Sequence, residues 1–194
     1  MTILNLKNSL RLFIITNCLL FTEFSSAQMF RVLVTNDDGI ESPLLISLAQ
    51  ALNKLTGIEV VVSAPHENQS GSSHSSIGGP LTVKQTNIPG IKEAYSVTGR
   101  PADAVRFGLN ELGKVQNFDL VVSGINRGAN VGDVSHLSGT VGAAMEAVFH
   151  GVPAIAVSQE ITGVDTASTT LFISELVTRY ITSPIEEGTI ISVN

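Results

Sequence analysis

The chain has 194 residues, a length that suits one ordinary domain. Apolar residues make up 43% of the sequence and charged residues only 14%, which excludes a disordered tail, a coiled coil and a collagen-like rod. The net charge is −6, and the Lys and Arg residues form no cluster along the sequence. A surface that follows a nucleic acid polymer is therefore excluded, because such a surface needs clustered cations to release counterions.

The first 27 residues have the features of a secretory signal peptide. Lys7 and Arg11 give a positive start, residues 12–21 form a short apolar run, and a Ser-Ser-Ala sequence ending at residue 27 suits a cleavage site. The apolar run is too short to span a bilayer. We therefore expect export to the periplasm and a working domain over residues 28–194 that is free of the membrane after cleavage.

The only cysteine of the chain, Cys18, falls inside this leader. The exported domain would therefore contain neither a disulfide nor a thiol nucleophile. Its chemistry must use oxygen and nitrogen groups.

Beyond residue 28, short apolar strands alternate with helices. The first half of this region predicts a strand over 31–35, a helix from Pro43, a strand over 59–63, a long polar loop over 65–79 and a strand over 94–97. The second half predicts a helix from Pro101, a strand over 118–123 and a helix over 141–150. A strand over 154–158, a helix over 166–180 and a strand over 189–193 follow. This alternation is typical of a parallel sheet covered on both faces. We predict an α/β fold, Rossmann-like, with three α/β/α layers and a mostly parallel sheet. No turn or polar tail follows the last strand, so we expect the sequence to be truncated at its C-terminus.

Polar side chains follow three of the predicted strands. Asp37 and Asp38 come directly after the first strand, Ser70 lies in the loop after the second, and Asn126 follows the strand that ends at residue 123. In open α/β sheets, ligands bind beyond the carboxyl ends of the strands, so these residues should share one edge. Two adjacent carboxylates repel each other, and a hard divalent cation held by oxygen ligands would compensate them. The alternative is that the two aspartates only form an Asx turn and cap the next helix.

A second candidate feature is the turn Ser138-Gly139-Thr140, which opens a helix. The free backbone N–H groups of such a turn suit a phosphate, although an ordinary N-cap has the same residues. No G-x-G-x-x-G follows the first strand, which disfavours a dinucleotide cofactor.

Three loop residues are weaker candidates. His74 and His136 lie in loops at the same edge and are either proton donors to a leaving group or plain loop residues. Arg127 either steers a phosphate or is a surface charge.

Five short motifs, taken together and in order, closely resemble the SurE family (survival protein E) of metal-dependent nucleotidases. They are VTNDDG at 34–39, AP followed by NQSG within 64–71, TGRPAD at 98–103, VSGINRGAN at 122–130 and SGTV at 138–141. The resemblance implies a SurE-like fold and an enzyme that hydrolyses nucleoside 5′- and 3′-monophosphates with one divalent ion, Mg²⁺ or Mn²⁺. Family members form dimers or tetramers through an extended C-terminal segment, which we expect to be missing here.

The resemblance also implies roles for individual residues. The implied metal ligands, which are the residues that the strand ends already indicate, are Asp37, Asp38, Ser70 and Asn126. Asp37 and Asp38 are also the implied catalytic pair, and Asp37 would hold or deprotonate a water activated by the ion. The implied phosphate-binding residues are Asn36, Asn130, Ser138, Gly139 and Thr140. The competing function is an exported protein that binds a metal ion or a nucleotide phosphate without turnover.

Overall fold

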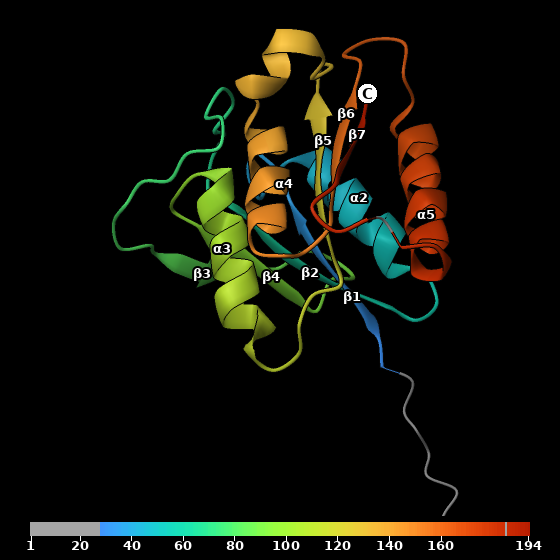
Figure 1. Cartoon of the computed structure of the whole chain (residues 1–194), viewed down its shortest axis with the longest axis horizontal. Helices are drawn as coiled ribbons and strands as arrows, with labels where there is room; N and C mark the ends of the chain where they lie inside the picture. The colour runs from blue at the N-terminus through green and yellow to red at the C-terminus, as the bar shows by residue number, and fades with distance from the viewer. Residues whose placement is uncertain (1–27, 185) are drawn as a thin grey trace, which may run out of the picture.

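Strands and helices alternate along the chain (Figure 1). The computed structural model describes residues 28–184 and 186–194, and the expected signal peptide (residues 1–27) lies outside them. The strands are β1 (Phe30–Thr35), β2 (Ile58–Pro65), β3 (Val83–Gln85), β4 (Glu93–Val97), β5 (Leu120–Arg127), β6 (Ala154–Gln159) and β7 (Ile190–Val193). The α-helices are α2 (Pro43–Asn53), α3 (Pro101–Glu111), α4 (Gly139–Phe149) and α5 (Thr166–Thr182), and two short 3₁₀ helices are η1 (Leu112–Lys114) and η2 (Gly132–His136).

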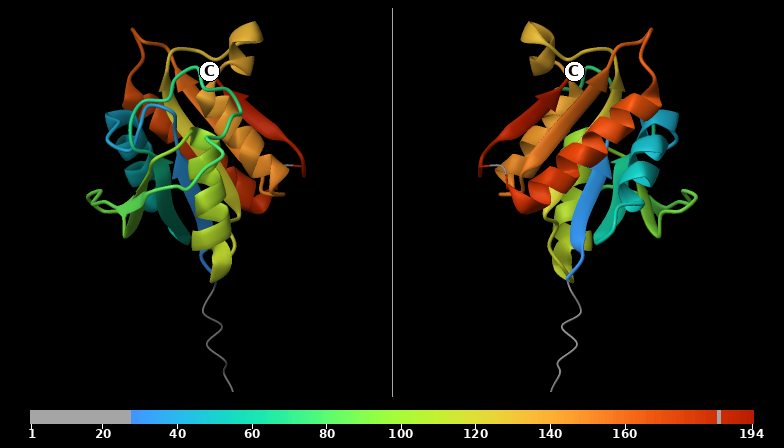
Figure 2. Two further views of the ribbon diagram at one scale, coloured as in Figure 1. Left: turned by 90° about the vertical axis from the view of Figure 1, so that its left-hand side faces the viewer. Right: turned by 90° about the vertical axis from the view of Figure 1, so that its right-hand side faces the viewer.

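The strands form one seven-stranded sheet in the order β3-β4-β2-β1-β5-β6-β7. Neighbouring strands are parallel, except that β3 pairs antiparallel with β4. Helices α2 and α5 pack together on one face of the sheet, and α3 and α4 pack together on the other (Figures 1 and 2). The predicted three-layer α/β fold with a mostly parallel sheet is therefore confirmed.

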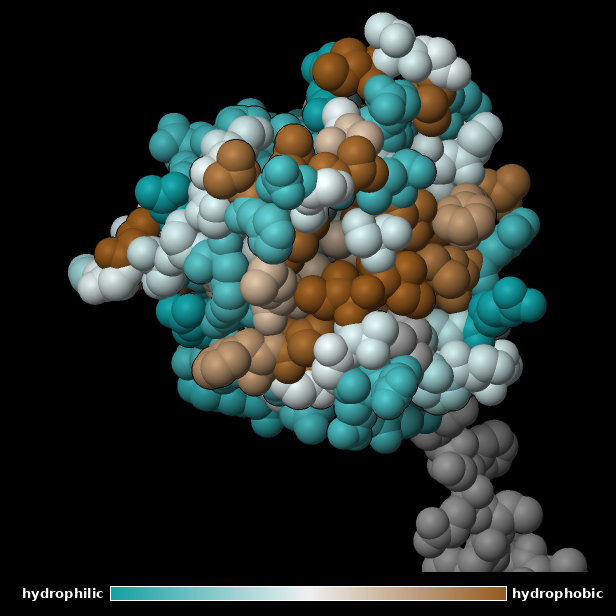
Figure 3. Space-filling view, turned by 45° about the horizontal axis from the view of Figure 1, so that its top comes forward, coloured by the Kyte–Doolittle hydropathy of each residue, from teal (hydrophilic) through white to brown (hydrophobic). Residues whose placement is uncertain are grey.

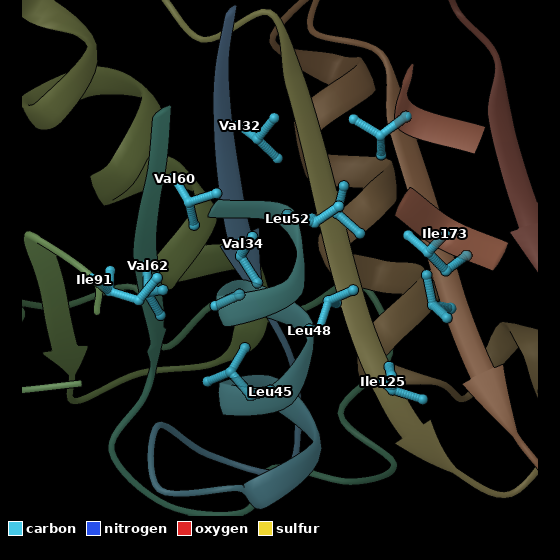
Figure 4. Close-up of a cluster of buried hydrophobic side chains, with 14 of the residues drawn as sticks. Val32, Val34, Leu45, Leu48, Leu52, Val60, Val62, Ile91, Ile125 and Ile173 are labelled. Carbon is cyan, nitrogen blue, oxygen red and sulfur yellow. The ribbon is translucent and has the colours of Figure 1, made fainter. Parts of the chain in front are cut away.

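The central strands are apolar on both faces because a helical layer covers each face. Val32 and Val34 of β1 pack with Leu45 and Leu48 of α2 in one core cluster (Figure 4), whereas Leu33, between them, belongs to the cluster beneath α3 and α4. Burying each such side chain stabilises the fold by about 1.5–3 kcal/mol. This two-sided burial explains why the central strands are nearly continuous apolar runs.

Two local predictions need correction. The strand predicted over residues 118–123 continues as β5 to Arg127, so Asn126 lies within a strand end and not in a loop. Gly124 permits this continuation, because a Cβ built there would lie 2.5 Å from the carbonyl oxygen of Val157 on β6. The edge strand β3 lies where the sequence pattern predicted no strand.

Among residues 28–184 and 186–194, no helix is both long enough and apolar enough to cross a bilayer.

Candidate active site

The candidate site lies at the edge of the sheet where the order of the strands reverses between β1 and β5. In the sheet, β2 and β4 lie on one side of β1, whereas β5, β6 and β7, which come later in the chain, lie on its other side. The carboxyl ends of β1 and β5 therefore flank a topological switch point, the position where open α/β sheets bind ligands. In Figure 1 the arrowhead of β5 points to this edge, beneath η2.

Asn36 forms the turn that follows β1. Its buried amide donates to the backbone oxygen of Gly39 at 3.0 Å and accepts from the Gly39 N–H at 3.2 Å. Ser42, at the start of α2, makes no side-chain cap bond. The turn is thus closed by Asn36 and not by the aspartates, so the Asx-turn alternative for Asp37 and Asp38 does not describe their side chains.

Asp37 is buried, with 3% of its surface exposed, and faces the start of α4. Its Oδ1 accepts a hydrogen bond of 2.6 Å from the hydroxyl of Thr140. Burial raises the pKa of Asp37, while the Thr140 hydroxyl and the backbone N–H groups of Asp37, Thr140 and Gly139 oppose that rise. The positive end of α4 thus acts on the Asp37 carboxylate, and direct binding of phosphate by Ser138, Gly139 and Thr140 stays a prediction.

Asp38 is half-buried beside Asp37. Its Oδ1 accepts from the amide of Asn68 at 3.0 Å, whereas its Oδ2 is buried and has no hydrogen-bond partner among the described residues. Burial and the charge of Asp37 raise the pKa of Asp38, and the nearby guanidinium and backbone of Arg127 oppose that rise. The exposed guanidinium of Arg127 thus lies near Asp38, and its action on a phosphate stays a prediction.

Asn68 connects the loop after β2 to the aspartate pair. While its amide nitrogen donates to Asp38, its Oδ1 accepts from the backbone N–H of Ser70 at 3.0 Å. The backbone N–H of Gln69 donates to the backbone oxygen of Asp37 at 2.7 Å. The structure thus brings the turn that carries Ser70 to the Asp37–Asp38 segment, and it adds Asn68, which the sequence analysis did not single out.

Ser72 is a second residue that the sequence analysis missed. Its side chain is buried, and its hydroxyl oxygen has no hydrogen-bond partner among the described residues. A Cβ built on Gly139 would lie 2.7 Å from this oxygen and 3.0 Å from the Asp37 Oδ2, so both oxygens border the same point. The clustering of serines after β2 was the only signal in the sequence for this contact.

The two remaining asparagines lie near the end of β5 and in the loop that follows it, on the other side of the switch point. Asn126, near the end of β5, donates from its amide nitrogen to the backbone oxygen of Gly128 at 2.7 Å, so the amide oxygen is the atom that a cation would use. Asn130 is buried and donates to the hydroxyl of Ser158 at 2.9 Å, which holds it against the end of β6. Its predicted contact with phosphate stays a prediction.

The donor atoms at this edge fit a hard divalent ion. Two carboxylates, a hydroxyl and an amide supply only oxygen atoms, which Mg²⁺ and Mn²⁺ prefer. The unpartnered Asp38 Oδ2 is a buried anionic atom that a cation would satisfy. Within the described ranges, no group of three or more His, Cys, Asp or Glu side chains is placed to hold a metal ion, so the fit rests on two acids with neutral oxygens.

The two histidine candidates lie in different surroundings. The Nε2 of His74 is 2.5 Å from the Oε2 of Glu146 on α4, so this imidazole is directed to a buried carboxylate. His136 ends η2 and is exposed. Val131, Val134 and Leu137, which lie on η2 or next to it along the chain, are apolar and exposed. Figure 3, with the top of the molecule brought forward, shows apolar residues scattered among polar ones at this end.

Comparisons with known proteins agree with this architecture. The family model described as Survival protein SurE matches residues 32–194. The chain is 46% identical over 132 residues to the 5′-nucleotidase SurE of Clostridium beijerinckii, covering 67% of this chain and 51% of that protein. It is 44% identical over 165 residues to the 5′-nucleotidase SurE of Vibrio cholerae, covering 84% and 63%.

A solved structure gives the same result. The SurE protein from Aquifex aeolicus superposes with a TM-score of 0.73 at 34% identity, covering 84% of this chain and 64% of that one. The chain thus spans between about half and two thirds of the length of these relatives. On the strength of the family match and of these identities, the chain belongs to the SurE family.

Proposed function

We propose that this protein is a metal-dependent nucleotidase that releases phosphate from nucleoside 5′-monophosphates and 3′-monophosphates. The observation that carries the proposal is the Asp37–Asp38 pair, in which two adjacent carboxyls are desolvated and one oxygen, Asp38 Oδ2, has no partner. The relatives named 5′-nucleotidase support the same substrate class. A non-catalytic binding protein is not favoured, since those relatives bear the name of an enzyme.

In this proposal Asp37, Asp38, Ser70 and Asn126 hold one Mg²⁺ or Mn²⁺ ion. When bound, such an ion supplies positive charge to the phosphoryl oxygens and acidifies a water molecule. Burial and the repulsion between the two carboxylates raise the pKa of Asp38, and the ion would offset that repulsion.

The chain's own groups then position the reactants. Asp37 holds the attacking water and takes its proton, and the Thr140 hydroxyl keeps the Asp37 carboxylate in a fixed orientation through its 2.6 Å hydrogen bond. Arg127, beside Asp38, attracts the phosphate dianion. His74 is occupied by Glu146, so it is not placed as the donor to the leaving group.

A neighbouring cavity offers room for the nucleoside. It has a volume of about 300 Å³ and lies at the ends of β2 and β4, where Glu67, Gln69, Thr98 and Arg100 contribute to its lining. Its lining combines apolar surface with a few polar groups, an arrangement that suits a base and a sugar. Because the backbone of Gln69 is also bonded to Asp37, this cavity adjoins the aspartate pair.

The test measures inorganic phosphate released from 5′-AMP and 3′-AMP by the purified protein, first with Mn²⁺ and then with EDTA. We expect release with Mn²⁺, its abolition by EDTA, and a loss of at least about 100-fold in Asp37→Asn. Asp165→Asn is the matched control, because Asp165 only caps α5 by accepting from the Ala167 N–H, and Asn caps equally well.

Two results would overturn the proposal. One is phosphate release that EDTA leaves unchanged, and the other is wild-type turnover in Asp37→Asn. Export to the periplasm stays a prediction.

A further inference from the structure

A buried acid outside the candidate site binds the loop that carries Ser70 and Ser72. Glu146 lies in the middle of α4 with 3% of its surface exposed. An unpaired carboxylate at such a position would cost several kcal/mol, so it needs hydrogen-bond donors beside it. Three side chains contact it, and they come from three different parts of the chain.

Two of these donors belong to the helical layer itself. Arg106 of α3 donates from Nε to Oε1 at 2.9 Å, and the Nε2 of His150, one turn further along the chain, lies 3.2 Å from the same oxygen. The third donor is His74, whose Nε2 lies 2.5 Å from Oε2. His74 belongs to the serine loop, which we define as residues 66–79. Glu146 therefore ties this loop to α4.

Further bonds fix the same half of the serine loop. Asp103 of α3, which is 1% exposed, accepts from the Ser76 hydroxyl at 2.5 Å and from the Ile77 N–H at 3.1 Å. The Ser73 N–H donates to the backbone oxygen of Leu137 at 3.0 Å. Hydrogen bonds to two buried acids and to the backbone oxygen of Leu137 thus hold residues 73–77 against α3 and α4.

The other half of the serine loop carries the groups that meet the aspartates. Ser72 is two residues before His74, and Ser70 is four residues before it. A chain spans at most about 3.3–3.6 Å per residue, so the position of His74 restricts where Ser70 and Ser72 lie. The Glu146 carboxylate also stays ionised at neutral pH, because burial raises its pKa but the bonds from His74 and Arg106 outweigh that effect.

We propose that Glu146 is a positioning residue for the candidate site, which through His74 holds the serine loop so that Ser70 and Ser72 stay beside Asp37 and Asp38. This inference rests on the proposed function for its effect on metal binding, but the placement of the loop does not depend on that function. Outer partners of metal ligands typically contribute about 10–100-fold to metal affinity.

The experiment compares two histidines that contact the same carboxylate. His74→Ala removes the bond from the serine loop, whereas His150→Ala removes a bond from the residue that directly follows α4. His74→Gln keeps a side-chain donor that can reach Glu146. The first readout is the apparent Kd for Mn²⁺, which is taken from the dependence of the Tm on the Mn²⁺ concentration and is called the Mn²⁺ midpoint below. The second is hydrogen exchange of the Gln69 amide, whose bond to the Asp37 oxygen reports on the loop without metal.

We expect His74→Ala to raise the Mn²⁺ midpoint about tenfold or more and to speed exchange at Gln69, with His74→Gln partly restoring both. His150→Ala should leave both readouts at wild-type values. The inference is overturned if His74→Ala leaves Gln69 exchange unchanged, or if His150→Ala has the same effect.

If the wild type shows no Mn²⁺-induced rise in Tm, the metal-dependent function fails. Exchange at Gln69 still decides the role of Glu146 and His74 in that case.

Discussion

The contact between α4 and the serine loop predicts that Gly142→Ala destabilises the protein. Within a helix, alanine is ordinarily more favourable than glycine by about 1 kcal/mol. Here, however, the new Cβ would lie 2.2 Å from the Ser73 carbonyl oxygen and 2.8 Å from the His74 nitrogen. These are backbone atoms, which cannot rotate away as a side chain does. Overpacking of this kind costs about 1–3 kcal/mol, so the net loss is about 1 kcal/mol, or a Tm lower by about 2–4 °C.

Thermal unfolding in EDTA, followed by a Mn²⁺ titration, measures both consequences of this change. Gly142→Ala should lower the Tm and raise the Mn²⁺ midpoint, because the displaced backbone carries Ser72 and His74 with it. Gly113→Ala is the control, since its Cβ would meet the Phe118 ring at an ordinary 3.7 Å. If Gly142→Ala is more stable than wild type and binds Mn²⁺ equally well, the serine loop does not rest on α4 as described.

Three further predictions concern single side chains. Thr140→Val removes the 2.6 Å bond to Asp37, a bond to a charged group worth about 1.5–3 kcal/mol. It should lower kcat/KM for AMP about 10–100-fold, and Thr140→Ser should retain most of the activity. The pKa of Glu146 is held below its ordinary value of 4.5, so its contribution to stability is present above that pH and is lost as the pH falls through the lower, folded pKa. The Tm of the wild type should therefore fall more steeply than that of Glu146→Gln between about pH 5 and pH 3, and equal slopes would contradict the pairing. Arg31→Met removes the 2.9 Å ion pair with Glu59, and because Arg31 lies at the opposite end of β1 it should lower the Tm by several degrees without moving the Mn²⁺ midpoint.

The sequence predicted the fold best where the local pattern alone decides the structure, as in the apolar strands and in the turn after β1. Apolar runs predicted the central parallel strands because those strands are buried on both faces, and turn residues correctly located the end of β1. Gly124 was misleading, since a glycine after an apolar run ordinarily ends a strand, whereas here it lets β5 continue beside Val157. The three-residue strand β3 has too little pattern to predict, because only its pairing with β4 makes it a strand.

At the site, the sequence predicted which residues share an edge but not how they are held. Asn68 and Ser72 were not distinguishable from other polar residues of a serine-rich loop. The role of Glu146 was also hidden, since a lone acid in an alanine-rich helix is ordinarily exposed. Its burial depends on His74 and Arg106, which are 72 and 40 residues away along the chain. Pairings over such distances leave no local pattern.

The long sequence separation between Asp37 and Thr140, 103 residues, has a consequence for how the protein is made. During synthesis, the first aspartate emerges long before the helix that orients it. The site therefore does not exist in the nascent chain until β5 and α4 have joined the strands made earlier. A ligand held there binds only the completed domain, and at 100 times its Kd it would add about 2.7 kcal/mol to the free energy of unfolding. The proposed ion would thus stabilise newly made protein only after the whole domain has folded.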